Sequence, residues 1–276
     1  MVWSRTDFVN AVKALLALVA AMTFAPAAAL AAPRVMSLDS CADQYVLALA
    51  PRETIVGLSH RAVSRDSYMR DHAGGLPLRR ATLESLVAAR PDVVVRLWGG
   101  DARLSKALEK KNITTVALDD ATDFDGLRVN VRKVAAALDR RPEGEAIIAR
   151  MDARLARSAG AGKGRSALYL TPGGFTAGSG TLIDAMLKSA GYSNATKDPY
   201  FAPVSLERMV MQPPTAVVLG LFDRIRAGSD RWGPGRHAAL QKVVATRTVA
   251  SLPGAVVGCP GWFAAEGSEM LAKAAR

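Results

Sequence analysis

The side chains that could perform acid–base or metal chemistry are few in this sequence and lie far apart. The three histidines are scattered, and no two have the i, i+4 spacing of a zinc-binding helix (His60, His72 and His237). The nearest thing to a carboxylate pair is Asp119 beside Asp120, and adjacent side chains normally point apart. We find no paired nucleophile and base and no ligand set for a metal-bound water. The sequence therefore predicts no catalytic residue and no metal site built by the protein alone.

The composition is strongly basic, and this excess of basic residues allows three interpretations. The chain has 276 residues and a formal net charge of +11. Its basic residues are scattered and form no stripe interleaved with aromatic residues, which argues against nucleic acid as a partner. An anionic ligand and an acidic membrane surface are alternatives. The reading we favour is a solvated basic exterior, because net charge governs solubility and encounter rather than site chemistry.

Two segments of the sequence follow the same pattern. Residues 82–95 and 205–219 share a hydroxyl residue suited to cap a helix, a glutamate in the first turn, an apolar helical face, a proline and an apolar strand. The glutamates are Glu84 and Glu207. The helix dipole alone favours an acid in a first turn by roughly 0.3–1 kcal/mol, but it does not explain the same acid in both copies. A repeat with so long a period indicates two related lobes, and two lobes suggest a cleft for a small molecule.

Short apolar strands alternate with helices around the two copies. Before the long central helix at residues 143–159 we expect strands at 34–38, 54–58, 92–97 and 114–118. After it we expect a strand at 166–170, a glycine-rich loop at 171–180, and short strands near 248–251 and 255–258. Ser40 is expected to cap the first helix, with Asp43 completing a capping box.

This alternation predicts an α/β protein with two Rossmann-like lobes, mainly parallel sheets and one long connector helix. We assign residues 32–141 to the N-terminal lobe, 142–160 to the connector helix and 161–276 to the C-terminal lobe.

Ligands of such lobes bind at the loops that follow the carboxyl ends of the strands. These loops carry aromatic, basic and glycine residues, which would suit a large planar or chelated ligand. We therefore predict ligand contacts from Cys41, His60, Arg61, Trp98, Gly99, Phe175, Phe222, Arg224 and Trp262. The alternative for the tryptophans is ordinary packing at the rim of the lobes.

Residues 1–31 have the features of a cleaved signal peptide. Basic residues precede or enter an apolar run that is rich in small residues and interrupted by Pro26, and Ala29 and Ala31 give the small-x-small spacing of a cleavage site. A membrane span is the rival reading. Export would permit a disulfide, and Cys41 and Cys259 either bridge the lobes or remain as thiols.

In the order and spacing of its segments, the chain resembles the periplasmic substrate-binding proteins of ABC importers for cobalamin, ferric siderophores and haem. The resemblance rests on residues 37–44 (Ser-Leu-Asp-Ser-Cys-Ala-Asp-Gln), the two glutamate repeats, residues 116–132, the glycine-rich residues 173–182, and residues 258–261 (Gly-Cys-Pro-Gly). It implies two lobes joined by a rigid helix, and a protein that is not an enzyme and has no cofactor of its own.

The resemblance also implies what the protein binds. Its ligand would be a metal chelate, namely a ferric siderophore, haem or cobalamin, held noncovalently between the lobes. Glu84 and Glu207 would dock on arginines of the membrane permease dimer. We expect a periplasmic monomer. The alternative is an exported two-lobed enzyme that acts on a small molecule in the same cleft.

Overall fold

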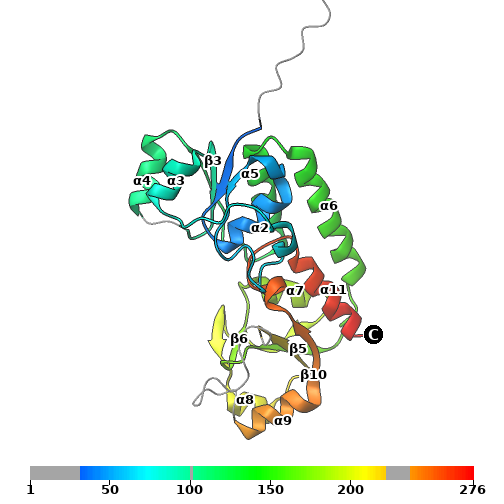
Figure 1. Ribbon diagram of the computed structural model, residues 1–276. Helices are drawn as coiled ribbons and strands as arrows, with labels where there is room; N and C mark the ends of the chain where they lie inside the picture. The colour runs from blue at the N-terminus through cyan, green and yellow to red at the C-terminus, as the bar shows by residue number, and fades with distance from the viewer. Residues whose placement is uncertain (1–31, 100–101, 222–236) are drawn as a thin grey trace, which may run out of the picture. The chain divides into compact units, whose positions relative to one another are not determined.

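Two four-stranded parallel sheets organise the chain. The structure is a computed structural model that describes residues 32–99, 102–221 and 237–276 (Figure 1). The first sheet has the order β2-β1-β3-β4, with β1 at Val35–Ser37, β2 at Ile55–Gly57, β3 at Val93–Arg96 and β4 at Thr114–Ala117. The second has the order β10-β9-β5-β7, with β5 at Ser166–Leu170, β7 at Ser193–Asn194, β9 at Ala216–Gly220 and β10 at Thr248–Leu252.

Strand β3, in the interior of the first sheet, is buried on both faces, as its unbroken apolar run requires. Val93 and Val95 pack in one core cluster, while Val94 between them packs in another, because successive side chains of a strand point to opposite faces. Helices supply the rest of these clusters: α2 (Ser40–Leu49) and α5 (Phe124–Ala137) on one face, and α3 (Leu83–Ala89) and α4 (Ala102–Lys110) on the other.

The second sheet repeats this arrangement. Tyr169 of β5 packs in a cluster with α7 (Leu182–Ser189) and α11 (Ala264–Ala274). Leu168 and Leu170 of the same strand pack in another with α8 (Leu206–Met211) and α9 (Ala238–Arg247). A separate antiparallel ribbon pairs β6 (Phe175–Ala177) with β8 (Phe201–Pro203).

Helix α6 (Arg141–Ser158) lies in the chain between the two sheets. Figure 1 shows it in green alongside the red α11, and the two are joined by an ion pair between Arg154 and Glu266 at 2.9 Å. Arg128 of α5 and Asp152 of α6 form another ion pair. The predicted fold class, two lobes with parallel sheets and one connector helix, is therefore confirmed.

The predicted lobe boundaries remain predictions, because Pro33–Arg276 forms one compact unit. The predicted signal peptide at residues 1–31 lies outside the described residues. Among the helices that the structure describes, none is long and apolar enough to cross a membrane.

The strand predicted at residues 255–258 is wrong. The segment is a short helix, α10 (Gly254–Val257). Its apolar residues favour a strand by propensity, but Pro253 precedes them as the N-cap, and its carbonyl accepts hydrogen bonds from the backbone N–H of Val256 (2.9 Å) and Val257 (3.2 Å). The loop predicted at residues 171–180 also differs, since it contains β6.

The predicted N-cap of α2 is shifted by one residue. The cap is Asp39, whose carboxylate accepts from the backbone N–H of Cys41 and Ala42, and Ser40 is the first helical residue. Asp43 therefore makes no capping box, and its side chain is buried. Both caps of the repeated segment are as predicted, with Thr82 bonding Ser85 N and Ser205 bonding Arg208 N.

Candidate functional site

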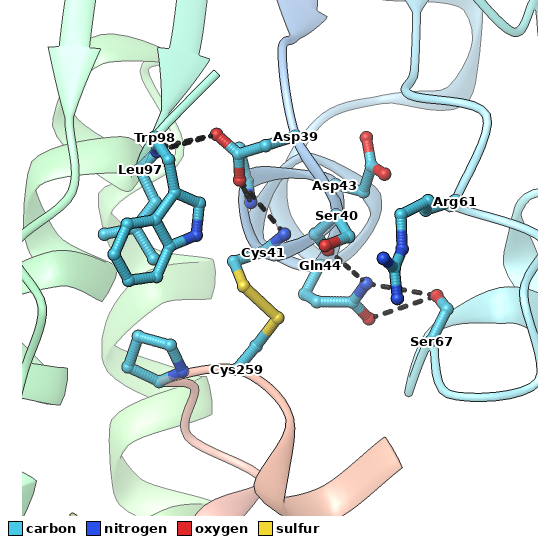
Figure 2. The surroundings of a disulfide bond; sticks show 12 residues. Asp39, Ser40, Cys41, Asp43, Gln44, Arg61, Ser67, Leu97, Trp98 and Cys259 are labelled. Carbon is cyan, nitrogen blue, oxygen red and sulfur yellow. Dashed lines mark hydrogen bonds between the residues drawn. A yellow bond between two sulfur atoms is a disulfide. The ribbon is translucent and has the colours of Figure 1, made fainter. Parts of the chain in front are cut away.

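Asp39 joins the start of α2 to the loop that follows β3. One carboxylate oxygen caps the helix, accepting from Cys41 N (3.1 Å) and Ala42 N (2.9 Å). The other accepts from the backbone N–H of the loop, at 2.7 Å from Leu97, 3.1 Å from Trp98 and 2.9 Å from Gly99 (Figure 2). One side chain thus fixes two backbone segments that come from neighbouring strands.

Gly99 is required at its position by close approach. A Cβ atom there would lie 2.5 Å from the carbonyl oxygen of Leu38, well inside any tolerated contact. The glycine therefore lets the loop after β3 lie against the end of β1 and receive the Asp39 carboxylate. Trp98, immediately before it, is 60 % exposed.

Asp43, one turn further along α2, holds a second loop. Its carboxylate accepts from the hydroxyl of Ser37 and from Ser59, at 2.9 Å from the backbone N and 2.5 Å from Oγ. Burial raises the pKa of Asp43 to about 6, against the opposing effect of these hydrogen bonds. Ser59 begins the loop that carries His60 and Arg61, so Asp43 ties that loop to the helix.

Gln44 anchors the far end of the same loop. Its amide nitrogen donates to Ser67 Oγ at 3.0 Å and to the carbonyl oxygen of Ser40 at 2.8 Å. Its amide oxygen accepts from Met69 N at 2.8 Å. Both ends of the Gln44 amide are satisfied within the protein, so its role is to position the loop.

Cys41 and Cys259 form a disulfide, which settles the alternative left open by the sequence. It connects α2 to the segment after α10, across 218 residues of sequence. Two further contacts accompany it. Tyr45 Oη donates to the carbonyl oxygen of Pro260 at 2.7 Å, and Tyr68 Oη donates to Glu266 at 2.9 Å. The two halves of the chain are thus joined covalently and by buried or half-buried polar contacts.

An open hollow with a cavity volume of about 160 Å³ lies at this disulfide, and we call it the disulfide pocket. This volume is smaller than the roughly 300–1,000 Å³ of a typical small-molecule site. Figure 2 shows Trp98 on one side of the disulfide and Arg61 on the other. The lining residues come from both halves of the chain: Ser40, Cys41, Gln44, Arg61, Asp66, Ser67, Trp98, Gly258 and Cys259.

The charged pair of the disulfide pocket is Arg61 with Asp66. The guanidinium lies 2.7 Å from the carboxylate, and the side chain of Arg61 is still 55 % exposed. A half-exposed arginine that is already oriented by a carboxylate can receive an anionic group with its remaining N–H donors. Within the described part of the chain, no group of three or more His, Cys, Asp or Glu residues is placed to hold a metal ion. The free N–H donors of Arg61 are what the pocket offers to an anionic group.

A scan against protein-family models matches residues 35–256 to a family described as periplasmic binding protein. The chain belongs to this periplasmic binding protein family. A curated relative, the cobalamin-binding protein of Halobacterium salinarum, is 28 % identical over 206 residues, which cover 70 % of this chain and 56 % of the relative. The chain thus spans little more than half the length of the curated relatives that it matches.

Solved structures of the same class share the fold of this periplasmic binding protein. The haem-binding protein RhuT of Roseiflexus sp. RS-1 has a TM-score of 0.66 at 20 % identity and covers 89 % of this chain and 100 % of its own. An Fe³⁺-hydroxamate transport protein of Saccharomonospora viridis has a TM-score of 0.65 at 22 % identity and covers 88 % of this chain and 93 % of its own. The family is one of periplasmic binding proteins, the first neighbour is a haem-binding protein, and the second belongs to an Fe³⁺-hydroxamate transport system. None of them supports the enzyme alternative.

The structure brings four predicted ligand residues of this periplasmic binding protein together. Cys41, Arg61 and Trp98 line the disulfide pocket, and Gly99 fixes the loop that carries Trp98. His60 is exposed beside Arg61 but does not line the pocket. Phe222 and Arg224 lie outside the described residues.

Two predicted aromatic contacts lie elsewhere. Trp262 packs edge-on against Tyr45 at 5.4 Å and Phe263 at 5.3 Å, in contact with both core clusters that meet there. That placement corresponds to the packing alternative. Phe175 is 47 % exposed on the β6–β8 ribbon, where Tyr200 (67 %) and Phe201 (60 %) are exposed as well.

Three residues that position the pocket, namely Asp39, Gln44 and Asp66, were not predicted from the sequence. Asp39 carried a usable signal, since an aspartate directly before a predicted helix is a strong N-cap residue. Gln44 carried none, because its partners lie in another segment of the chain, and Asp66 carried none, because it pairs with Arg61 within an irregular loop.

Both glutamates of the repeat are exposed in the first turns of their helices. Hydrogen bonds from its own backbone and from Thr82 hold the pKa of Glu84 below its ordinary value, so Glu84 is ionised near neutral pH. Arg208, the neighbour of Glu207, pairs with Asp198 at 3.1 Å. Its charge is thus partly engaged away from Glu207.

Proposed function

We propose that this chain is the periplasmic solute-binding component of an ABC import system, and that it captures a ferric siderophore or cobalamin and delivers it to the membrane permease. Haem is the third member of the ligand class. The observation that carries this proposal is an exposed tryptophan, Trp98, facing a half-exposed arginine, Arg61, across the disulfide pocket of a periplasmic binding protein.

The chemistry of these two groups favours a chelate with a flat face and an anionic edge. An indole held by its backbone offers a rigid surface against which an aromatic or macrocyclic ring can pack. A guanidinium offers directed donors to carboxylate, phosphate or hydroxamate oxygens. The exposed aromatics of the β6–β8 ribbon, which are Phe175, Tyr200 and Phe201, are a further set of ring contacts that we assign to ligand binding.

A titration panel tests the proposal. Isothermal calorimetry measures the binding of four compounds: cyanocobalamin, haemin, a ferric hydroxamate and a ferric catecholate. Each compound is then recovered, and its mass is measured by mass spectrometry. We expect one class to bind and to return unchanged. Trp98→Ala should weaken that binding roughly tenfold to a hundredfold, while Trp98→Phe, which keeps a ring, should weaken it less. Absence of binding across the panel would overturn the proposal, and a ligand returned with altered mass would favour the enzyme alternative.

Delivery is assigned to Glu84 and Glu207. Both are exposed carboxylates at equivalent positions of the repeat, so they can meet two equivalent cationic loops of a permease dimer. Reversing both charges, as Glu84→Lys with Glu207→Lys, should abolish binding to the permease and leave the calorimetric ligand affinity unchanged. Persisting permease binding in the double variant would refute the docking role.

A further inference from the structure

An exposed valine follows each docking glutamate by one helical turn. Val87 in α3 is 49 % exposed, and Val210 in α8 is 58 % exposed. The residues are equivalent in the repeat, because each lies three positions after its glutamate, Glu84 or Glu207. Residues three apart on a helix share a face. The acid and the valine therefore form one exposed surface in each lobe.

Each helix also has a buried face, which packs on the core. Leu86 and Met209, which are also equivalent, are buried under α3 and α8. On the outer face, Met211 at 75 % exposed and Leu83 at 44 % exposed extend the apolar area beside the valines. Large apolar side chains left in water beside a charged group are typical of surfaces that bind another protein.

We infer that the aliphatic groups beside the two glutamates contact the permease, so that each lobe offers a mixed surface of one carboxylate and one apolar cluster. We call these the α3 docking surface (Leu83, Glu84 and Val87) and the α8 docking surface (Glu207, Val210 and Met211). The inference rests on the proposed function and deepens it, because it states what the permease must present: two copies of a loop that carries both a cation and an apolar side chain.

Two features of the molecule select this occupant. The first is charge, since ionised Glu84 favours a cationic partner over an anionic lipid surface. The second is duplication, since an equivalent acid and an equivalent valine appear in both lobes. A partner with a single loop could contact only one of these surfaces at a time, whereas a partner with two copies of the same loop can contact both. Engaging both at once makes the second contact intramolecular, so two small surfaces can together give useful affinity.

The test uses replacements that keep the shape of the side chain. Val87→Thr and Val210→Thr conserve β-branching and helix propensity while introducing a hydroxyl. Val129→Thr is the matched control, because Val129 is a helical valine of similar exposure (45 %) in α5, outside both surfaces. Each variant is loaded with the compound of the calorimetric panel that binds it: cyanocobalamin, haemin, the ferric hydroxamate or the ferric catecholate. It is then titrated against the permease–ATPase complex that imports that compound, reconstituted in lipid nanodiscs, with protein-free nanodiscs as the blank.

We expect each valine replacement to weaken permease binding about tenfold and the pair about a hundredfold. The control variant should bind as the unmodified protein does, and all variants should keep their ligand affinity. If the Glu84→Lys, Glu207→Lys variant loses binding but the valine variants match the control, this inference is wrong and the proposed function stands. If the unmodified protein binds the complex no better than the blank, both fail. Equal loss in Val129→Thr would also overturn the inference.

Discussion

Replacing Asp43 by asparagine should remove a specific pH dependence of stability. The Asp43 carboxylate is buried and accepts hydrogen bonds from Ser37 and Ser59, and its pKa is raised from 3.8 to about 6. Burial is the main cause, and the nearby charge of Asp39 adds to it. Asparagine has nearly the same shape. Its amide oxygen can accept from Ser37 and from the backbone of Ser59, and its amide nitrogen can donate to Ser59 Oγ.

The sign of the effect follows from linkage. Because the folded state holds the proton more tightly than the unfolded chain does, this group favours folding fully below pH 3.8, and that contribution is lost as the pH rises to about 6. The two pKa values differ by about 2, which corresponds to roughly 3 kcal/mol at 1.36 kcal/mol per pH unit. The free energy of unfolding should therefore fall by up to that amount, relative to the variant, across this window.

Urea denaturation at a series of pH values from about 3.5 to about 7.5 measures the effect. The quantity to plot is the unfolding free energy of the unmodified protein minus that of Asp43→Asn, which cancels the titration of all other groups that the substitution does not disturb. We expect this difference to decline between pH 4 and pH 6 and to be flat above. A difference that stays constant, or one that rises with pH, would refute the assignment of a raised pKa to a buried Asp43.

Three further variants probe the framework of the pocket. Asp39→Ala, which deprives five backbone N–H groups of their acceptor, should lower the unfolding free energy in urea by about 2–4 kcal/mol and weaken ligand binding by freeing the Trp98 loop. Replacing both cysteines, as Cys41→Ser with Cys259→Ser, opens a loop of 218 residues and should lower the unfolding free energy by up to roughly 5 kcal/mol on the chain-entropy estimate. Denaturation with and without reductant measures this loss, and reductant should not change the stability of the double variant. Tyr45→Phe leaves the Pro260 carbonyl without its buried donor and should cost about 1–3 kcal/mol in the same assay.

Those parts of the fold that depend on local sequence could be predicted. Most strands of the two sheets were found because runs such as Val93, Val94 and Val95 are apolar without interruption, which a strand buried on both faces requires. The short β7 at Ser193–Asn194, which has no apolar run, was not predicted. The caps Thr82 and Ser205 were found because a hydroxyl residue directly before an apolar helical pattern is typical of a helix N-cap.

The pocket itself depends on contacts that no local pattern contains. Asp39 and Ser40 are adjacent and both are good N-cap residues. The residue that caps the helix is Asp39, which also accepts hydrogen bonds from the backbone of residues 97–99, and no local pattern predicts that second contact. The ribbon at Phe175 forms because residues 201–203 pair with it. The disulfide needs two Cα atoms 5.3 Å apart, a distance set by the whole fold.

The two lobes resemble each other where they would meet the permease and differ where they would meet the ligand. The glutamate, the valine and the buried residue between them occur in both copies of the repeat. The strand ends do not match: β1 leads into the Asp39 cap and the disulfide, whereas β5 leads into the β6–β8 ribbon with its exposed aromatics. Under the proposed function this difference has a physical reason. A permease dimer presents the same loop twice, which favours keeping both docking surfaces alike, whereas a chelate with unlike faces is bound better by two walls that differ.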